Sequence, residues 1–147
     1  MDGREFLDTA RFLLNNRANE ADFRSAISRA YYACYHVITQ VAFDHSDKQL
    51  KRNSSITSKN KITHELLVRF LQQSADARIK MLGDDLFSLK GNRIDADYIL
   101  DKPISDDDSN DAIENAEFIL QSLSEIGKSD IGKALSDHLT RTQRKNF

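Results

Sequence analysis

Two clusters of polar residues interrupt the apolar patterns of this sequence. The first lies in the stretch "KGNRIDADY" and consists of Arg93, Asp95, Asp97 and Tyr98. An arginine can hold a phosphate or a carboxylate, and a phenol can donate or accept a hydrogen bond. Residues of these types are suited either to phosphate chemistry or to an ion pair that fixes one helix to another.

The second cluster lies in "SRAYYACYH", where Arg29, Tyr32 and His36 are three and four residues apart. This spacing places all three on one flank of a helix. A buried arginine needs an acidic partner, and either aspartate of the first cluster is available to Arg29 or Arg93. The residues alone leave both alternatives open: a site that binds phosphate, or an internal ionic contact.

Other common chemistries find little support in the sequence. The four histidines are scattered, and no Cys or His pair has the spacing of metal ligands, so we expect neither a metal nor a cofactor. The five glycines form no phosphate-binding loop, and serine–histidine–aspartate catalysis has no local signature. The single cysteine, Cys34, falls among apolar helical positions, which predicts a packed thiol.

Charge is distributed unevenly along the chain. Ten Lys or Arg residues face four acidic residues between positions 48 and 93, whereas nine acidic residues accompany Lys102 alone between positions 94 and 117. A basic section attracts phosphates, although solvated helix faces are charged too. The candidates for binding phosphate or RNA are Arg93, Lys90, Lys59 and Lys61.

These clusters must be positioned by helices. Apolar residues recur at helical spacing in segments 3–16, 20–43, 62–74, 76–90 and 105–123, and a shorter helix begins near Ser129. No useful period-two alternation occurs, so the sequence predicts an all-α, up-and-down bundle of five to six helices in one domain over residues 1–147. The residues expected to be mostly buried are Phe23, Ile27, Ala30, Cys34, Val37, Leu67, Phe70, Leu82, Leu86, Leu89, Ile113, Ala116, Leu120 and Leu123.

The ends of these helices are also predictable. Thr63 and Ser105 are expected N-caps, and Gly91 suits the position just past a helix end, which places the first cluster beyond that helix. Residues 44–61 are polar and predict a long exposed loop, and a basic tail begins at about residue 141. With no long apolar run and no signal core, we expect a soluble, cytoplasmic protein.

Four phrases together carry a family resemblance: "FRSAISRAYYACYH", "THELLVRF", "LFSLKGNRIDADY" and "ISDDDSNDAIENAEFIL". In this order and spacing they resemble the HEPN superfamily, and within it the branch with an Arg-x-x-Ala-Asp-Tyr motif. Arg93, Ala96, Asp97 and Tyr98 match that motif, and the resemblance covers about residues 5–125.

The resemblance implies a homodimeric helical bundle, often a toxin or defence protein encoded with a nucleotidyltransferase partner. Nucleases of the superfamily carry an arginine, then four to six residues, then a histidine. They cleave RNA without a metal by letting a 2′-hydroxyl attack the neighbouring phosphate. Counting four residues on from Arg93 brings Tyr98, and an ordinary tyrosine, with a pKa of about 10, is a poor base at neutral pH.

The resemblance therefore implies Arg93, Tyr98 and Asp97 as catalytic residues, with Arg29, Tyr32, His36 and His64 in support. Arg93 is expected at a cleft facing the dimer partner, with the Tyr98 ring partly buried and its hydroxyl hydrogen-bonded. Tyr98 is by resemblance also a candidate for modification by the nucleotidyltransferase. The leading hypothesis is a metal-independent endoribonuclease, and the alternative is a non-catalytic module that binds a nucleotide or a partner protein.

Overall fold

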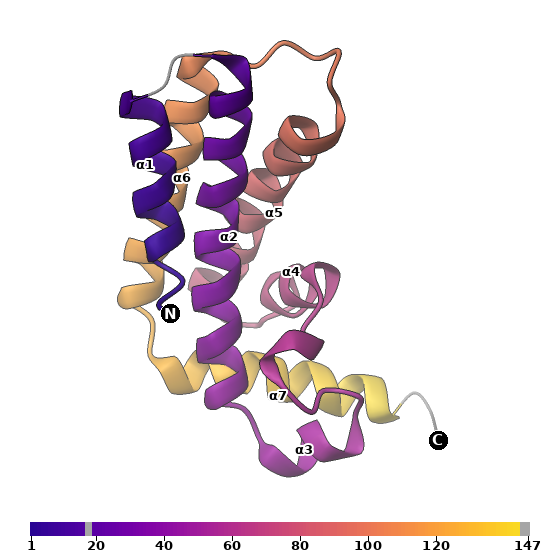
Figure 1. The fold of residues 1–147 in the computed structure, drawn as a ribbon. Coiled ribbons are helices and arrows are strands. Elements are labelled where there is room, and N and C mark those ends of the chain that lie inside the picture. The colour runs from indigo at the N-terminus through magenta and orange to yellow at the C-terminus, as the bar shows by residue number, and fades with distance from the viewer. Residues whose placement is uncertain (17–18, 145–147) are drawn as a thin grey trace. The chain divides into compact units, whose positions relative to one another are not determined.

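The computed structural model describes residues 1–16 and 19–144, and within these ranges it is helical and contains no strand. Its elements are α1 (Glu5–Asn16), α2 (Glu20–Asp44), α3 (Lys48–Asn53), the 3₁₀ helix η1 (Lys59–Lys61), α4 (His64–Gln72), α5 (Ala77–Tyr98), α6 (Asp106–Ser124) and α7 (Lys128–Arg144) (Figure 1). The all-α class is confirmed. One helix more than expected is present, since α3 lies in the predicted loop.

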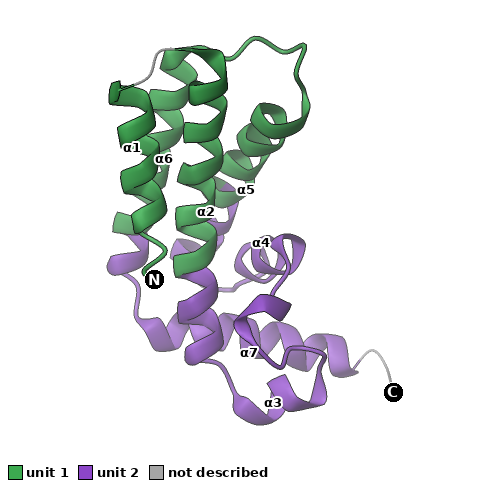
Figure 2. Ribbon diagram, viewed as in Figure 1, with its two compact units in different colours: residues 1–37, 85–121 green, residues 38–84, 122–147 purple. Residues whose placement is uncertain are grey.

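The chain forms two compact units (Figure 2). The first comprises residues 1–37 and 85–121, and the second comprises residues 38–84 and 122–147. The boundary between the units falls inside α2, α5 and α6. A single domain over residues 1–147 stays a prediction.

In the first unit, α1, α2 and α6 lie side by side, and α5 packs against α2. Small side chains on α2 and α6 bring these two helices close, and the Cys34 thiol lies 3.6 Å from the carbonyl oxygen of Ala116. Burial raises the pKa of Cys34 to about 12, so this thiol is packed and inert. Of the residues predicted to be buried, all are buried except Phe23, which is partly exposed.

Helix starts follow the predicted caps. The Thr63 hydroxyl accepts a hydrogen bond from the Leu66 N–H at 3.1 Å at the start of α4. At the start of α6, Ser105 and Asp108 cap each other reciprocally: each side chain accepts from the backbone N–H of the other residue. Both caps are confirmed.

The second unit contains the unexpected helix α3. Asp47 caps it by accepting a hydrogen bond from the Leu50 N–H at 2.9 Å. Helix α7 stabilises it from a distance in the sequence, because Gln143 donates to the Leu50 carbonyl and Ser136 accepts from the Asp47 N–H. The prediction of an exposed loop over residues 44–61 is therefore wrong in part, and Ile56 within it is buried.

Helix α5 continues past the predicted stop at Gly91 and ends at Tyr98. No glycine among the described residues has a positive φ, so Gly91 does not adopt the left-handed conformation that ends helices. The buried stripe of α5 continues from Leu89 through Arg93 to Ala96, at steps of four and three. Arg93 occupies a buried position of α5. Because a charged residue stands in the buried stripe, the apolar periodicity that predicts a helix is interrupted in the sequence.

None of the helices described is long and apolar enough to cross a membrane.

Candidate functional site

The Arg93 guanidinium lies among three tyrosine rings in the first unit. Its Cζ is 5.2 Å from the ring centroid of Tyr31, 5.7 Å from that of Tyr32 and 5.9 Å from that of Tyr98. Only 8% of the Arg93 side chain is exposed. Burial raises the pKa of Tyr31, although the Arg93 charge acts in the opposite direction, so this phenol stays neutral. The rings attract the cation but do not neutralise it.

Arg93 has few polar partners in the part of the chain that the structure describes. One guanidinium nitrogen lies 3.7 Å from Asp97 Oδ2, one helical turn along α5, which is longer than a hydrogen bond. The buried Nε has no hydrogen-bond partner. A guanidinium carries five N–H donors, so Arg93 still has donors that can bind an acceptor from outside the described residues.

Asp97 links Arg93 to α2. Its Oδ2 accepts a hydrogen bond from the Ser28 hydroxyl at 3.1 Å. The intrachain ion pair that the sequence left open is therefore present as a contact between Asp97 and Arg93. Asp95 belongs to a different pair, because its Oδ2 lies 2.6 Å from the Lys102 amine.

Tyr98 departs from expectation. The prediction of a partly buried ring is wrong, since 68% of the residue is exposed, and no hydrogen bond to its hydroxyl occurs within the described ranges. Tyr98 follows Phe87, Gly91 and Ile94 at steps of four, three and four, and all of them are exposed. It therefore lies on the outer face of α5, although its ring still contacts Arg93.

The second cluster forms a stack between α1 and α2. The Arg29 Cζ lies 5.2 Å from the ring centroids of both Phe6 and Tyr32. The exposed His36 ring stacks on Phe6 with centroids 5.2 Å apart, and lies 5.9 Å from Tyr32. Partial burial lowers the pKa of His36, and the Arg29 charge lowers it further.

The two clusters meet at Tyr32. Both Arg29 and Arg93 place their guanidiniums over its ring. Within residues 1–16 and 19–144, Asp97 pairs with Arg93, and no carboxylate pairs with Arg29. The surroundings of Tyr32 therefore carry an excess of positive charge.

Other predicted site residues lie elsewhere. Lys90 is partly exposed on α5, three residues before Arg93. Lys59, Lys61 and His64 belong to the second unit, and Lys59 lies 3.8 Å from the Asp44 carboxylate. The structure thus gathers Arg93, Asp97, Tyr98, Lys90, Arg29, Tyr32 and His36 in the first unit.

Arg24 is a residue that the sequence did not single out. Its guanidinium donates hydrogen bonds to the backbone carbonyls of residues 95, 96, 99, 100 and 102, and it also pairs with Glu20 at 2.9 Å. Glu20 in turn accepts from the Ile104 N–H at 3.1 Å. These contacts fix the end of α5 that carries Tyr98. The four-residue spacing of Glu20 and Arg24 predicts an ion pair on one helix. No local pattern in the sequence predicts the hydrogen bonds from Arg24 to distant backbone carbonyls.

The second cluster also matches a spacing that the resemblance implies. Six residues separate Arg29 from His36, which falls within the arginine–histidine spacing implied by the resemblance. Counting from Arg93 alone misses this second match.

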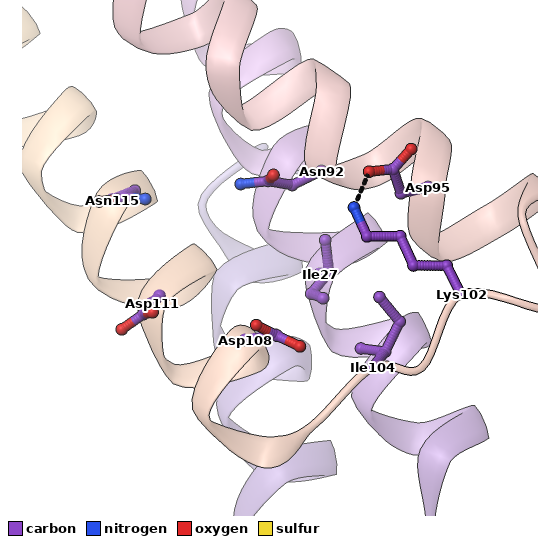
Figure 3. Close-up of a pocket in the computed structure, with 8 residues that line it drawn as sticks. All are labelled: Ile27, Asn92, Asp95, Lys102, Ile104, Asp108, Asp111 and Asn115. Atoms are coloured by element: carbon purple, nitrogen blue, oxygen red, sulfur yellow. Dashed lines mark hydrogen bonds and ion pairs between the residues drawn. The ribbon is translucent and has the colours of Figure 1, made fainter.

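A separate pocket of about 260 Å³ lies among α2, α5, α6 and the segment that joins α5 to α6 (Figure 3). Asp95, Asp108 and Asp111 line it together with two asparagines, and Lys102 extends to Asp95. Three carboxylates repel a phosphate, so this pocket is not a second part of an RNA site. Within the described ranges, no three His, Cys, Asp or Glu side chains are grouped so as to hold a metal ion.

The fold and the site define a class: a small helical domain with a buried arginine among tyrosines. The model of the HEPN domain family matches residues 2–126, and the chain belongs to this family. No curated protein and no solved structure matches the chain.

Proposed function

We propose that this protein acts on RNA as a HEPN-type toxin or defence component. It cleaves RNA without a metal ion, and Arg93 holds the phosphate that is attacked. The observation that carries the proposal is the Arg93 guanidinium, which is nine-tenths buried and has a buried Nε without a partner in the described residues. Phosphate oxygens are acceptors of the right charge and geometry for such a group.

Charge supports an anionic ligand. Two guanidiniums contact Tyr32, and within the described residues a carboxylate, Asp97, pairs with one of them, Arg93. A phosphate adds the negative charge that this environment lacks. Asp97 keeps Arg93 in place through Ser28, and the exposed Tyr98 hydroxyl is free to donate to a phosphate oxygen or a base. Lys90, three residues before Arg93 on α5, attracts the strand electrostatically.

The outer face of α5 supports pairing of two copies. Phe87, Ile94 and Tyr98 are exposed along it, and Gly91 lies in the middle of the row. A Cβ built at Gly91 meets nothing within 4 Å, so a second helix can approach closely there. Pairing through this face places the exposed Tyr98 of each copy at the interface, where its ring contacts the Arg93 of its own chain.

The alternative is a non-catalytic module that binds a nucleotide or a partner such as a nucleotidyltransferase. The contacts of Arg93 with Asp97, and of Asp97 with Ser28, favour it, because they also serve a purely structural role. The exposed Tyr98 hydroxyl is accessible to a modifying partner. In this alternative the α5 face binds that partner.

An RNA cleavage assay in EDTA tests the proposal. The wild-type protein is expected to cut RNA and leave 2′,3′-cyclic phosphate ends. Arg93→Met is expected to reduce the rate by about 10²–10³-fold, as loss of a charge-stabilising group does. The control is Arg11→Met, which removes a surface arginine of the same unit that pairs with Glu117. Absence of cleavage of any RNA by the wild type overturns the nuclease and favours the alternative.

A further inference from the structure

The two units carry opposite net charge. Residues 38–84 and 122–147, which form the second unit, contain thirteen Lys or Arg and eight Asp or Glu. Residues 1–37 and 85–121 contain eight Lys or Arg and fifteen Asp or Glu. Charges that only keep a surface soluble need no such separation by sign. A polyanion is therefore attracted to the second unit, although Arg93 belongs to the first.

Exposed cations of the second unit gather where α3 packs against α7 (Figure 1). At this contact, Gln143 of α7 donates a hydrogen bond to the Leu50 carbonyl of α3 at 3.0 Å. Four exposed cations of the described residues lie within two residues of this bond along the chain, and we call them the α3–α7 cations: Lys48, Arg52, Arg141 and Arg144. The pair on α3 is four residues apart and the pair on α7 three, so each pair shares one side of its helix.

No carboxylate offsets these charges locally. The α3–α7 cations form no ion pair within the part of the chain that the structure describes. Asp44, just before α3, pairs with Lys59 at 3.8 Å, and Asp47 caps the start of α3. On α7, Asp137 pairs with Lys133 at 3.0 Å. No acidic residue occurs from 48 to 64 or from 138 to 147, so the two segments that carry these cations have no carboxylate of their own.

Helix α3 holds its two cations in a fixed place although it is short. Its third basic residue, Lys51, is buried and donates from Nζ to the Phe43 carbonyl at 2.5 Å, which ties α3 to the end of α2. Ser136 of α7 accepts from the Asp47 N–H at 2.8 Å. The exposed charges of α3 are therefore presented by a helix that is anchored on two others, and little ordering is needed when a ligand binds.

The surroundings of these cations favour a nucleic acid over a membrane. A helix that binds a lipid surface adds large apolar side chains to its cations. Within the described residues, none of the large exposed apolar side chains lies on α3, η1 or α7. A phosphate backbone needs only exposed Lys and Arg side chains, because its binding is driven by the release of counterions.

We infer that the α3–α7 cations bind the phosphate backbone of RNA outside the cleavage site, an inference that rests on the proposed function for the identity of the polyanion. Each cation contacts a phosphate and reads no base, so the surface is indifferent to sequence. Because all four side chains are exposed, salt screens each contact. The surface therefore adds affinity for a strand that Arg93 also holds, and by itself it binds RNA only weakly.

The salt dependence of RNA binding tests this inference. The probe is a single-stranded 2′-O-methyl RNA of mixed sequence, which has no free 2′-hydroxyl and is not cleaved. The variant replaces all four α3–α7 cations: Lys48→Gln, Arg52→Gln, Arg141→Gln and Arg144→Gln. The slope of the logarithm of the binding constant against the logarithm of salt concentration is expected to become less steep by about 3, since each lost phosphate contact removes about 0.7. At about 50 mM salt the variant is expected to bind at least about 10-fold more weakly.

The matched control removes the same charge from the same unit at exposed positions away from the contact between α3 and α7: Arg69→Gln, Arg78→Gln, Lys80→Gln and Lys128→Gln. Its slope is expected to stay within about 1 of the wild-type slope. In the cleavage assay, the four-cation variant is expected to raise KM at about 50 mM salt and to keep the wild-type kcat, because contacts remote from the reacting phosphate bind substrate and transition state alike. Thermal unfolding should show both variants folded, as all eight side chains are exposed.

The outcomes separate this inference from the proposed function. Equal loss of slope in the variant and the control means a general effect of net charge and overturns the surface, while cleavage by the wild type leaves the proposed function standing. Loss of binding to phosphatidylserine vesicles without loss of binding to RNA also overturns it, in favour of a membrane. If the wild type cleaves no RNA but the slope falls in the variant alone, the surface stands and the nuclease fails. A wild type that binds no RNA at about 50 mM salt overturns the surface outright.

Discussion

At the scale of single residues, Arg93 combines two roles that usually exclude each other. It fills a position in the apolar stripe of α5, yet it keeps a charge. Burial of an ion costs several kcal/mol unless partners compensate. Three tyrosine rings and one carboxylate at 3.7 Å give partial compensation, and this imbalance is the strongest indication of an anionic ligand.

Arg29→Gln is expected to raise the pKa of His36. The substitution removes the second cause of the lowered pKa, while partial burial, the larger cause, remains. The pKa should therefore move up towards 6.5 and stay below it. Titration of the His36 imidazole by NMR measures this, with Arg11→Gln as the control, and a pKa that stays fixed or falls contradicts the account.

The sequence predicted some of this site and not the rest. The types and spacing of residues identified Arg93 and Asp97 and the flank of Arg29, Tyr32 and His36. The prediction that Tyr98 is partly buried was wrong, because the exposure of this residue depends on which face of α5 turns outwards. That face is set by how the helix packs against α2, which no local pattern encodes.

At the scale of helices, local signals predicted local structure. The caps at Thr63 and Ser105 act within three residues, so they are visible in the sequence. The end of α5 was misplaced because a glycine signal at position 91 competed with a buried stripe that contains an arginine. Helix α3 was missed because its partners, Ser136 and Gln143, lie about ninety residues away.

Two glycine substitutions with the same chemistry are expected to have opposite effects. A Cβ at Gly132 would clash with the His45 carbonyl oxygen, so Gly132→Ala should lower the free energy of unfolding by about 1–3 kcal/mol. A Cβ at Gly91 meets nothing within 4 Å, so Gly91→Ala should raise it by up to about 1 kcal/mol through helix propensity. Urea unfolding at low protein concentration measures both. Equal effects of the two substitutions would be inconsistent with the packing of α7.

At the scale of the whole molecule, the ordered set of motifs predicted the family, and the match over residues 2–126 confirms it. The predicted dimer needs a surface through which two copies can pair, and a sequence motif does not define such a surface. The exposed row on α5 only becomes visible once the helix is known to continue through Gly91.

Gly91→Arg is expected to separate the proposed dimer. It places a long charged side chain in the middle of the exposed row and disturbs no neighbour within its own chain. Ser88→Arg, an exposed position beside the row, is the matched control. Light scattering should give twice the chain mass of 16.8 kDa for the wild type and the control, and a single chain mass for Gly91→Arg. A wild-type protein that stays at the single mass at micromolar concentration rejects the dimer.

The claim that Arg93 holds an RNA phosphate is tested most directly by unfolding with and without RNA. Arg93→Met replaces the guanidinium by an apolar chain of similar length, and the Asp97 that remains is partly exposed and bound by Ser28. The variant alone should therefore unfold within about 1 kcal/mol of the wild type. A non-cleavable RNA at 100 times its dissociation constant should stabilise the wild type by about 2.7 kcal/mol and leave Arg93→Met unchanged. If the variant is strongly destabilised on its own while RNA stabilises neither protein, Arg93 is a structural ion pair and the account is wrong.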